Sequence, residues 1–274
     1  MPNSVTGTNV AISLDGRGAL VTGSGAGIGR ATALLLARAG ATIAVNDIDG
    51  ARAKDTADEI SVAGGHAVAL PADVTDPEQV QMLIDGCIEE LGRLDIAVNN
   101  VGMLAGLGVR PITDVDADYA HTIVNQNLIS SLLCCAAESR VMVAAGRGGV
   151  IINVASGETT RAAPLLSVYG AAKSAVRHLT TSMAVELGPS GIRVLAVAPG
   201  TTATEHVRAA MSQEHLDSIA ASTPLQRHCT PEDLANLILL LVSDYAAAVT
   251  GQFVLADAGA HIALNRPRSA PEPA

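Results

Sequence analysis

The stretch ALVTGSGAGIGRATALLLARAG, residues 19–40, decides the fold. An apolar run leads into a glycine-rich turn, and a helical pattern follows directly. Glycine permits backbone angles that a Cβ forbids, and it lets the chain approach a pyrophosphate held by free N–H groups at a helix start. A plain tight turn also uses glycine, but strand, turn and helix in this order favour a dinucleotide site. The spacing is not G-x-G-x-x-G, and the predicted binding residues of the turn are Gly23, Ser24, Gly25, Gly27, Ile28 and Gly29.

An acidic residue, Asp47 in IAVNDID, follows the next apolar run. A carboxylate there can accept both hydroxyl hydrogens of an adenosine ribose, and it repels a 2′-phosphate. No arginine or lysine stands beside Asp47 to reverse that preference, since the nearest following base is Arg52. We therefore predict NAD(H) rather than NADP(H), with Ile48 in the same site. Asp49 is interpreted as a solvent-exposed helix cap.

Short apolar runs alternate with helical patterns along the chain. Unalternating apolar runs are typical of parallel strands that are covered on both faces. Asp76-Pro77-Glu78 and Thr230-Pro231-Glu232 each offer a capping side chain and a proline at the first helical position. The pattern predicts an α/β fold, a single doubly wound (Rossmann) domain over residues 12–262 with a seven-stranded parallel sheet flanked by helices. Residues 1–11 are assigned to an N-terminal extension and residues 263–274 to a flexible C-terminal tail. The predicted strands are Ala19–Val21, Thr42–Val45, Ala67–Leu70, Ile96–Val98, Val150–Ile152, Arg193–Val197 and Phe253–Leu255.

The composition excludes several functions. The net charge of −10 argues against nucleic acid or an anionic membrane as partner. The four cysteines have no metal-ligand or redox spacing and are interpreted as buried apolar residues, and the seven histidines show no ligand cluster, so no metal is expected. The N-terminus lacks a basic segment followed by an apolar run, so no secretory signal is expected, and the longest apolar run, in Leu234–Val242, is too short to cross a bilayer. A soluble, cytoplasmic protein is expected.

Tyr169 stands out because the chain has only three tyrosines, one phenylalanine and no tryptophan. Lys173 follows four residues later, so both side chains share one helix face. A free phenol has a pKa of about 10, and bringing it near neutrality takes roughly 4 kcal/mol. One cation about 4 Å away supplies on the order of 4 kcal/mol at an effective dielectric of 20, so Lys173 alone could suffice. The phenol could then donate a proton to a ketone or accept one from an alcohol.

The chain resembles the classical short-chain dehydrogenase/reductase family over essentially residues 12–262. The motifs that carry the resemblance are Thr22–Gly29, Asp73-Val74, Asn99–Gly102, Asn127, Ser156, Tyr169-x-x-x-Lys173 and Pro199–Thr204.

The resemblance implies a role for each motif. Ser156 would hydrogen-bond the reacting oxygen, Tyr169 would exchange its proton, and Lys173 would lower the pKa of the phenol and hold the nicotinamide ribose. Asn127 would anchor a water chain to that lysine. The resemblance also implies a homotetramer, built through the helices Asp114–Ala145 and Ser167–Leu187 and the final strand. The other implied cofactor contacts are Asp73, Val74 and Asn100 on the adenosine half, and Pro199, Thr202 and Thr204 near the carboxamide.

Three departures from the family pattern stand out: Val101 replaces an alanine, Ala155 a serine and Ala258 a glycine. None touches a catalytic role. The segment after Pro199 is alanine-rich, and its His206, Arg208 and His215 are interpreted as exposed helix charges.

The sequence is similar to bacterial hydroxysteroid dehydrogenases, which makes a hydroxysteroid one candidate substrate. A 3-oxoacyl thioester and a small or terpenoid alcohol are the alternatives. A non-catalytic NAD-binding sensor is the alternative of a different class.

Overall fold

The computed structural model describes residues 11–104 and 106–263. The assignments of the two chain ends therefore lie almost entirely outside the described residues. All seven predicted strands are present, and they form one parallel sheet in the order β3-β2-β1-β4-β5-β6-β7. Their bounds are β1 Gly18–Val21, β2 Thr42–Val45, β3 His66–Ala69, β4 Ile96–Asn99, β5 Gly149–Val154, β6 Ile192–Pro199 and β7 Phe253–Ala256.

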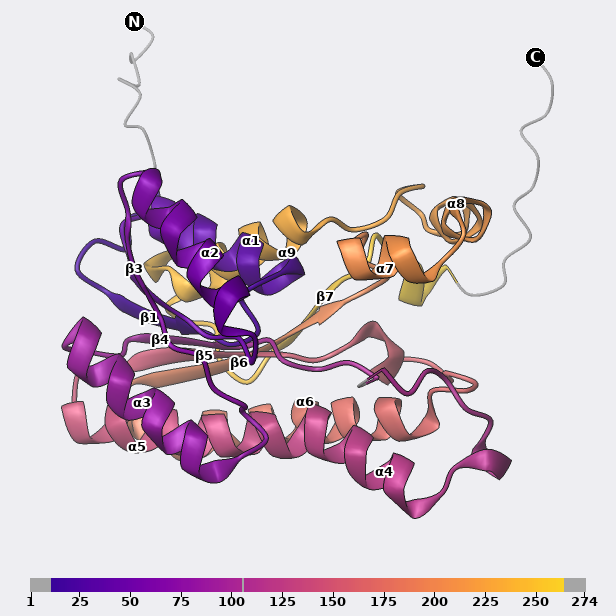
Figure 1. The fold of residues 1–274 in the computed structure, drawn as a ribbon, viewed down its shortest axis with the longest axis horizontal. Helices are drawn as coiled ribbons and strands as arrows, with labels where there is room; N and C mark the ends of the chain where they lie inside the picture. Colours follow the sequence, from indigo (N-terminus) through magenta and orange to yellow (C-terminus); the bar gives the residue numbers. More distant parts are fainter. Residues whose placement is uncertain (1–10, 105, 264–274) are drawn as a thin grey trace, which may run out of the picture.

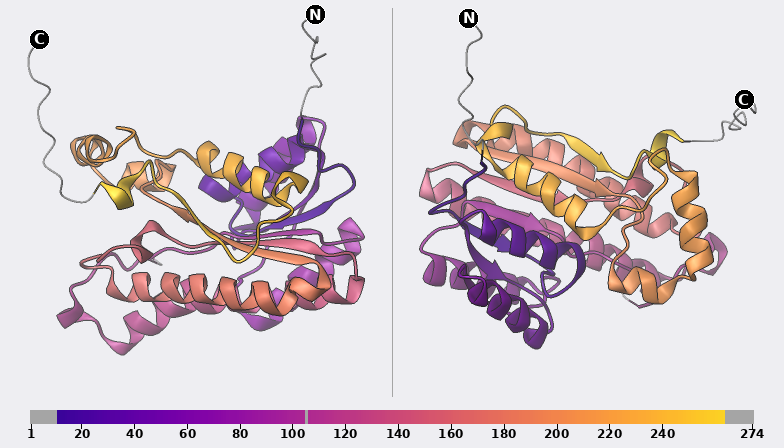
Figure 2. Two further views of the ribbon diagram at one scale, coloured as in Figure 1. Left: turned by 180° about the vertical axis from the view of Figure 1, so that it is seen from behind. Right: turned by 90° about the horizontal axis from the view of Figure 1, so that it is seen from above.

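Helices cover both faces of the sheet, as Figures 1 and 2 show. One layer holds α1 (Gly27–Arg38), α2 (Gly50–Val62) and α9 (Pro231–Val242). The opposite layer holds α3 (Pro77–Leu91), α4 (Ala117–Val124), α5 (Ser130–Ala145) and α6 (Ser167–Leu187). The short helices α7 (Glu205–Ala210) and α8 (Gln213–Ser222) follow β6 at the carboxyl end of the sheet. The prediction of a doubly wound α/β domain is confirmed.

Strand order reverses between β1 and β4, because β2 and β3 lie on one side of β1 and the later strands on the other. The loops after these two strands diverge and open a crevice at the carboxyl edge of the sheet. Ligands of doubly wound sheets bind in such a crevice. The glycine turn follows β1 and the Asn99–Gly102 motif follows β4, so the topology brings both motifs to this crevice.

The predicted helix caps are confirmed. The carboxylates of Asp49 and Asp76 accept hydrogen bonds from the first backbone N–H groups of α2 and α3. Thr230 and Asp233 form a reciprocal capping box at the start of α9, where Pro231 takes the first helical position. The core between sheet and helices is built from alanine, valine, leucine and isoleucine. All four cysteines are buried and free.

The expected helix Asp114–Ala145 begins later and is not uniform. Residues 117–145 are helical throughout, but Asn125–Ile129 form a π-helical turn between α4 and α5. By length and composition alone this helix could cross a membrane, although polar and charged residues interrupt it and it is not one apolar run. Core helices of globular proteins meet the same criteria. Here the helix packs on α3 and α6 and turns buried polar side chains toward the sheet.

Candidate active site

The glycine turn forms a cradle in which an added Cβ would collide with neighbouring atoms at two of its glycines. Gly23 and Gly27 have φ of 60° and 54°, a region that favours glycine. A Cβ on Gly29 would lie 2.3 Å from the carbonyl oxygen of Gly23, and one on Gly25 would lie 2.7 Å from Oδ2 of Asp47. Helix α1 begins at Gly27, its N-cap Ala26 offers no capping side chain, and its first turn holds no acid. These residues fit a dinucleotide, whose pyrophosphate would take the free N–H groups.

Residues from other strands hold this turn in place. The Asn100 side chain donates to the carbonyl oxygens of Thr22 and Gly23, at 3.1 and 3.2 Å, so it positions the turn. The Ser24 hydroxyl donates inward to the carbonyl oxygen of Val21 at 2.7 Å. The methyl group of Thr204 would be 3.3 Å from a Cβ on Gly27, so the loop after β6 lies against the turn.

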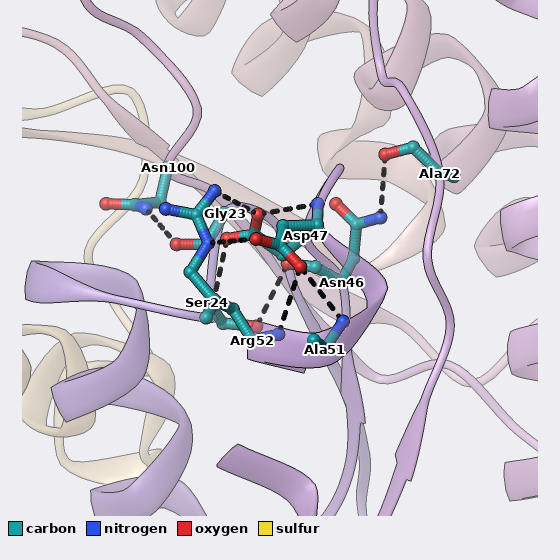
Figure 3. A network of polar contacts seen from close by, with 10 residues as sticks. Gly23, Ser24, Asn46, Asp47, Ala51, Arg52, Ala72 and Asn100 are labelled. Carbon is teal, nitrogen blue, oxygen red and sulfur yellow. Dashed lines mark hydrogen bonds and ion pairs between the residues drawn. The ribbon is translucent and has the colours of Figure 1, made fainter. Parts of the chain in front are cut away.

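Asp47 lies at the end of β2 and is almost fully buried. Its Oδ2 accepts from the Gly25 N–H at 3.1 Å, and its Oδ1 accepts from the Asp49 N–H at 3.0 Å. The half-exposed guanidinium of Arg52 also donates to Oδ1, at 3.0 Å (Figure 3). The expectation that no base stands beside Asp47 is therefore wrong. Five residues separate the two in sequence, but the first turns of α2 fold Arg52 back onto the carboxylate.

The remaining predicted cofactor residues lie along the same edge. The Asp73 carboxylate accepts from the Thr75 N–H and hydroxyl, at 2.9 and 2.8 Å, which fixes its loop beside buried Val74. Ile48 is an exposed apolar side chain at the crevice. Thr202, after Pro199 at the end of β6, donates to the carbonyl oxygen of Gly200 at 3.1 Å.

Ser156 and Tyr169 come together although thirteen residues separate them. Ser156 follows β5, and Tyr169 lies in the first turn of α6. The Ser156 hydroxyl lies close enough to the phenol of Tyr169 to lower its pKa through hydrogen bonding. Ser156 Oγ also accepts the N–H of Glu158 at 3.2 Å, so its own proton is free to donate.

The net pKa of Tyr169 is nevertheless raised. Burial is the largest cause, and the Glu158 carboxylate raises it further. The interpretation that Lys173 alone brings the phenol into working range is therefore wrong for the protein without its cofactor. Sequence spacing places both side chains on one face of α6 but does not reveal the burial that raises the pKa of the phenol.

Lys173 is buried beneath the site. Its Nζ donates to the carbonyl oxygen of Val154 at 2.9 Å, and burial lowers its pKa to about 8. The Asn127 side chain donates to the carbonyl oxygens of Met103 and Ile123, at 2.7 and 2.9 Å.

Gly102 lies between these two side chains. A Cβ there would be 2.3 Å from Lys173 Nζ and 2.8 Å from Asn127 Oδ1. Oδ1 of Asn127 is buried and lacks a partner among the described residues. A water donating to this oxygen would fit the water chain expected here.

The departures from the family pattern have local explanations. Val101 lies against Gly23, where the absent Cβ leaves room for its larger side chain. Ala258 adopts a φ of 55°, the left-handed region in which glycine is the usual residue. Ala155 packs in a small alanine cluster at β6. His206, Arg208 and His215 are exposed, as expected.

Comparison with known proteins identifies the family of this chain. A family model described as enoyl-(acyl carrier protein) reductase matches residues 23–261. The short-chain dehydrogenase/reductase astE of Aspergillus oryzae is 39% identical over 259 residues, which cover 93% of this chain and 98% of astE. The chain belongs to the classical short-chain dehydrogenase/reductase family.

Other members include 7α-hydroxysteroid dehydrogenases. The enzyme of Escherichia coli K12 is 35% identical over 254 residues, which cover 93% of this chain and 98% of that enzyme. A solved structure of a 7α-hydroxysteroid dehydrogenase with NADH and 7-oxo glycochenodeoxycholic acid superposes with a TM-score of 0.86 at 34% identity. That match covers 90% of this chain and 95% of the other. This dehydrogenase/reductase is thus an oxidoreductase that uses a nicotinamide cofactor and acts on a small molecule.

Proposed function

We propose that this protein is an NAD(H)-dependent oxidoreductase that interconverts a secondary alcohol and a ketone, with Tyr169 as acid and base. The observation that carries the proposal is the position of Ser156 next to Tyr169, with buried Lys173 one turn along α6, at the edge of the sheet that holds the glycine cradle. Bound nicotinamide would supply or accept the hydride.

The side chains divide the proton chemistry among them. In ketone reduction, Ser156 donates a hydrogen bond to the carbonyl oxygen while Tyr169 transfers its phenolic proton to that oxygen. The Lys173 ammonium lies one helical turn further along α6 and favours the phenolate that remains. The side-chain oxygen of Asn127 lies near Lys173, and a water bound to this oxygen could return a proton to the site. In alcohol oxidation the same groups act in reverse.

NAD(H) is the proposed cofactor because Asp47 is a fixed carboxylate where the adenosine ribose would bind. Support comes from the 7α-hydroxysteroid dehydrogenase that was solved with NADH. Arg52 competes for the carboxylate, and a half-exposed guanidinium could pair with a 2′-phosphate. Asp47→Ser should therefore shift the preference toward NADP(H), and adding Arg52→Gln should remove that gain. Kinetics with both cofactors test this, and an unchanged preference in Asp47→Ser would contradict the assignment.

A hydroxysteroid or another bulky apolar alcohol is the proposed substrate. Exposed apolar side chains occur on the segments that follow the carboxyl ends of β4, β5 and β6. They are Met103, Leu107, Val109, Leu165, Met211 and Leu225. A backbone hydrogen bond of 3.1 Å from Arg110 to Leu165 joins two of these segments. Such a rim matches an apolar ring system better than a sugar.

The decisive experiment is a panel of hydroxysteroids, 3-hydroxyacyl thioesters and small secondary alcohols, each tested for NAD reduction. Turnover that is lost in Tyr169→Phe supports the proposal. Cofactor binding without turnover on every class would instead support a sensor. We also propose a homotetramer through α4–α5, α6 and β7, and light scattering would test it.

A further inference from the structure

A hollow opens at the amino edge of the sheet, the edge opposite the candidate active site. It lies where β1, β4, β5 and β6 begin, on the side that faces away from α7 and α8 in Figure 1. Its volume is about 550 Å³, within the range of pockets that hold small molecules. The described residues that line it include neither the glycine cradle nor Ser156, Tyr169 or Lys173, so the hollow is separate from the site described above.

Four arginines line this hollow. They come from four separate segments, which lie just before β1, just before β4, after α5 and within β6, and they are Arg17, Arg93, Arg147 and Arg193. The chain has only 17 arginines and lysines and a net charge of −10, so a basic hollow runs against its overall charge. The acidic residues of the lining are Asp95 and Asp244, and four positive charges against two negative ones leave +2.

The two carboxylates each pair with one of these arginines. Arg17 Nη2 donates to Oδ1 of exposed Asp244 at 2.6 Å. Arg93 donates through Nε and Nη2 to both oxygens of buried Asp95, at 2.5 and 2.7 Å. Oδ2 of Asp95 also accepts from the Gly18 N–H at 2.8 Å, so this carboxylate is already fully engaged. Nε and Nη1 of Arg17 and Nη1 of Arg93 have no acceptor among the described residues.

Arg193 supplies charge to the hollow rather than free donors. Its Nη groups donate to four carbonyl oxygens at and beyond the end of α9, at 2.7 to 3.4 Å, on Leu241, Val242, Ser243 and Val249. Burial and the neighbouring charge of Arg17 lower the pKa of Arg193, and Asp244 opposes this effect. An anion in the hollow would offset the repulsion between the two guanidinium groups.

Arg147 is exposed, and its side chain has no hydrogen bond, ion pair or ring contact with any described residue. It lies in the glycine-rich turn between α5 and β5, and the turn before β6 lies directly against it. A Cβ on Gly148 would be 2.7 Å from the carbonyl oxygen of Gly191, and both glycines line the hollow. Backbone alone therefore forms this part of the wall. Guanidinium groups bind phosphate oxygens through paired N–H donors, which Arg147 has available.

We propose that this hollow is a second binding site, which takes a phosphate group with two negative charges, carried by inorganic phosphate or by a small phosphate ester. Arg147 would bind the phosphate oxygens, Arg17 and Arg93 would contribute their remaining N–H groups, and Arg193 would contribute its charge. A dianion matches the charge of +2 that the lining leaves. The site shares no residue with the proposed catalytic machinery, so the inference does not depend on the proposed function.

Isothermal titration calorimetry with inorganic phosphate and with glycerol 3-phosphate tests the site. Both titrations are made at saturating NADH, because the glycine cradle would itself attract a phosphate group. Saturable binding with a Kd of about 1 mM or below is expected. Tighter binding of glycerol 3-phosphate would identify an ester as the ligand, whereas equal or tighter binding of inorganic phosphate would identify the free anion.

Variants of Arg147 locate the binding. Arg147→Gln should raise the Kd about tenfold, because it removes charge-assisted hydrogen bonds. Arg147→Lys should raise it less, since the charge stays and only the paired donors are lost. Arg140→Gln, an exposed change on α5 outside the hollow, should leave the Kd unchanged. No saturable binding of either probe, or a Kd that Arg147→Gln leaves unchanged, would overturn the inference.

Discussion

Glu138 provides the clearest test of how a buried carboxyl group affects the stability of this core. It lies in α5 and is fully buried. Its Oε2 accepts from the Asn99 side chain at 3.0 Å, while Oε1 has no partner among the described residues. Asn99 also donates to Asn153 at 3.1 Å, and Asn153 donates to Thr180 at 3.0 Å, which completes a polar network across β4, β5 and α6.

Burial raises the pKa of Glu138 from 4.5 to about 7. At roughly 1.4 kcal/mol for each pH unit, this rise corresponds to about 3 kcal/mol. The folded protein binds the extra proton, so the contribution is fully present below pH 4.5 and is lost as pH rises through about 7. Above that pH the folded state must hold a buried charge that water would solvate in the unfolded chain.

Glu138→Gln removes the titration and keeps the shape, and its amide can donate to the unpartnered Oδ1 of Asn99. The variant should exceed the parent in unfolding free energy by about 3 kcal/mol at pH 8, and by less than about 1 kcal/mol at pH 5. Urea unfolding followed by circular dichroism, at one protein concentration and several pH values, measures both differences. Glu89→Gln, an exposed change on neighbouring α3, should show neither.

A difference between Glu138→Gln and the parent that stays constant from pH 5 to pH 8 would refute the reasoning. It would mean that the carboxyl group carries the same charge in the folded and unfolded states across this range. The buried network would then owe its stability to hydrogen bonds alone.

The other predictions concern the site and one cap. Gly102→Ala should lower kcat about a hundredfold, because the new Cβ would displace Lys173 Nζ. The circular dichroism spectrum should stay unchanged. Turnover close to that of the parent would contradict this prediction. The rate of ketone reduction should fall as pH rises through about 8, where Lys173 loses its charge, and a rate profile flat to pH 10 would speak against a role for the ammonium. Thr230→Ala should lower the unfolding free energy by about 1 kcal/mol through loss of the capping box, measured in urea against the parent.

Much of the fold could be predicted from residue patterns, because they act locally. Apolar runs such as Ile96–Val98 can only be buried on both faces, and Asp76-Pro77 starts a helix whatever lies around it. The glycines of the turn after β1 likewise indicate a cradle, because no other residue leaves such a turn open to a ligand. The sequence by itself thus determined the layered sheet, its crevice and the chemical types placed there.

Only the tertiary structure decided which partners those groups have and what their pKa values are. Arg52 reaches Asp47 because α2 folds back on its own start, and Asn127 meets Gly102 and Lys173 through a π-helical turn inside an otherwise regular helix. The pKa of Tyr169 depends on burial, which arises when distant segments pack and which no spacing along the chain encodes. Short-range patterns specify secondary structure, whereas charge balance depends on desolvation and on neighbours that meet only in the folded protein.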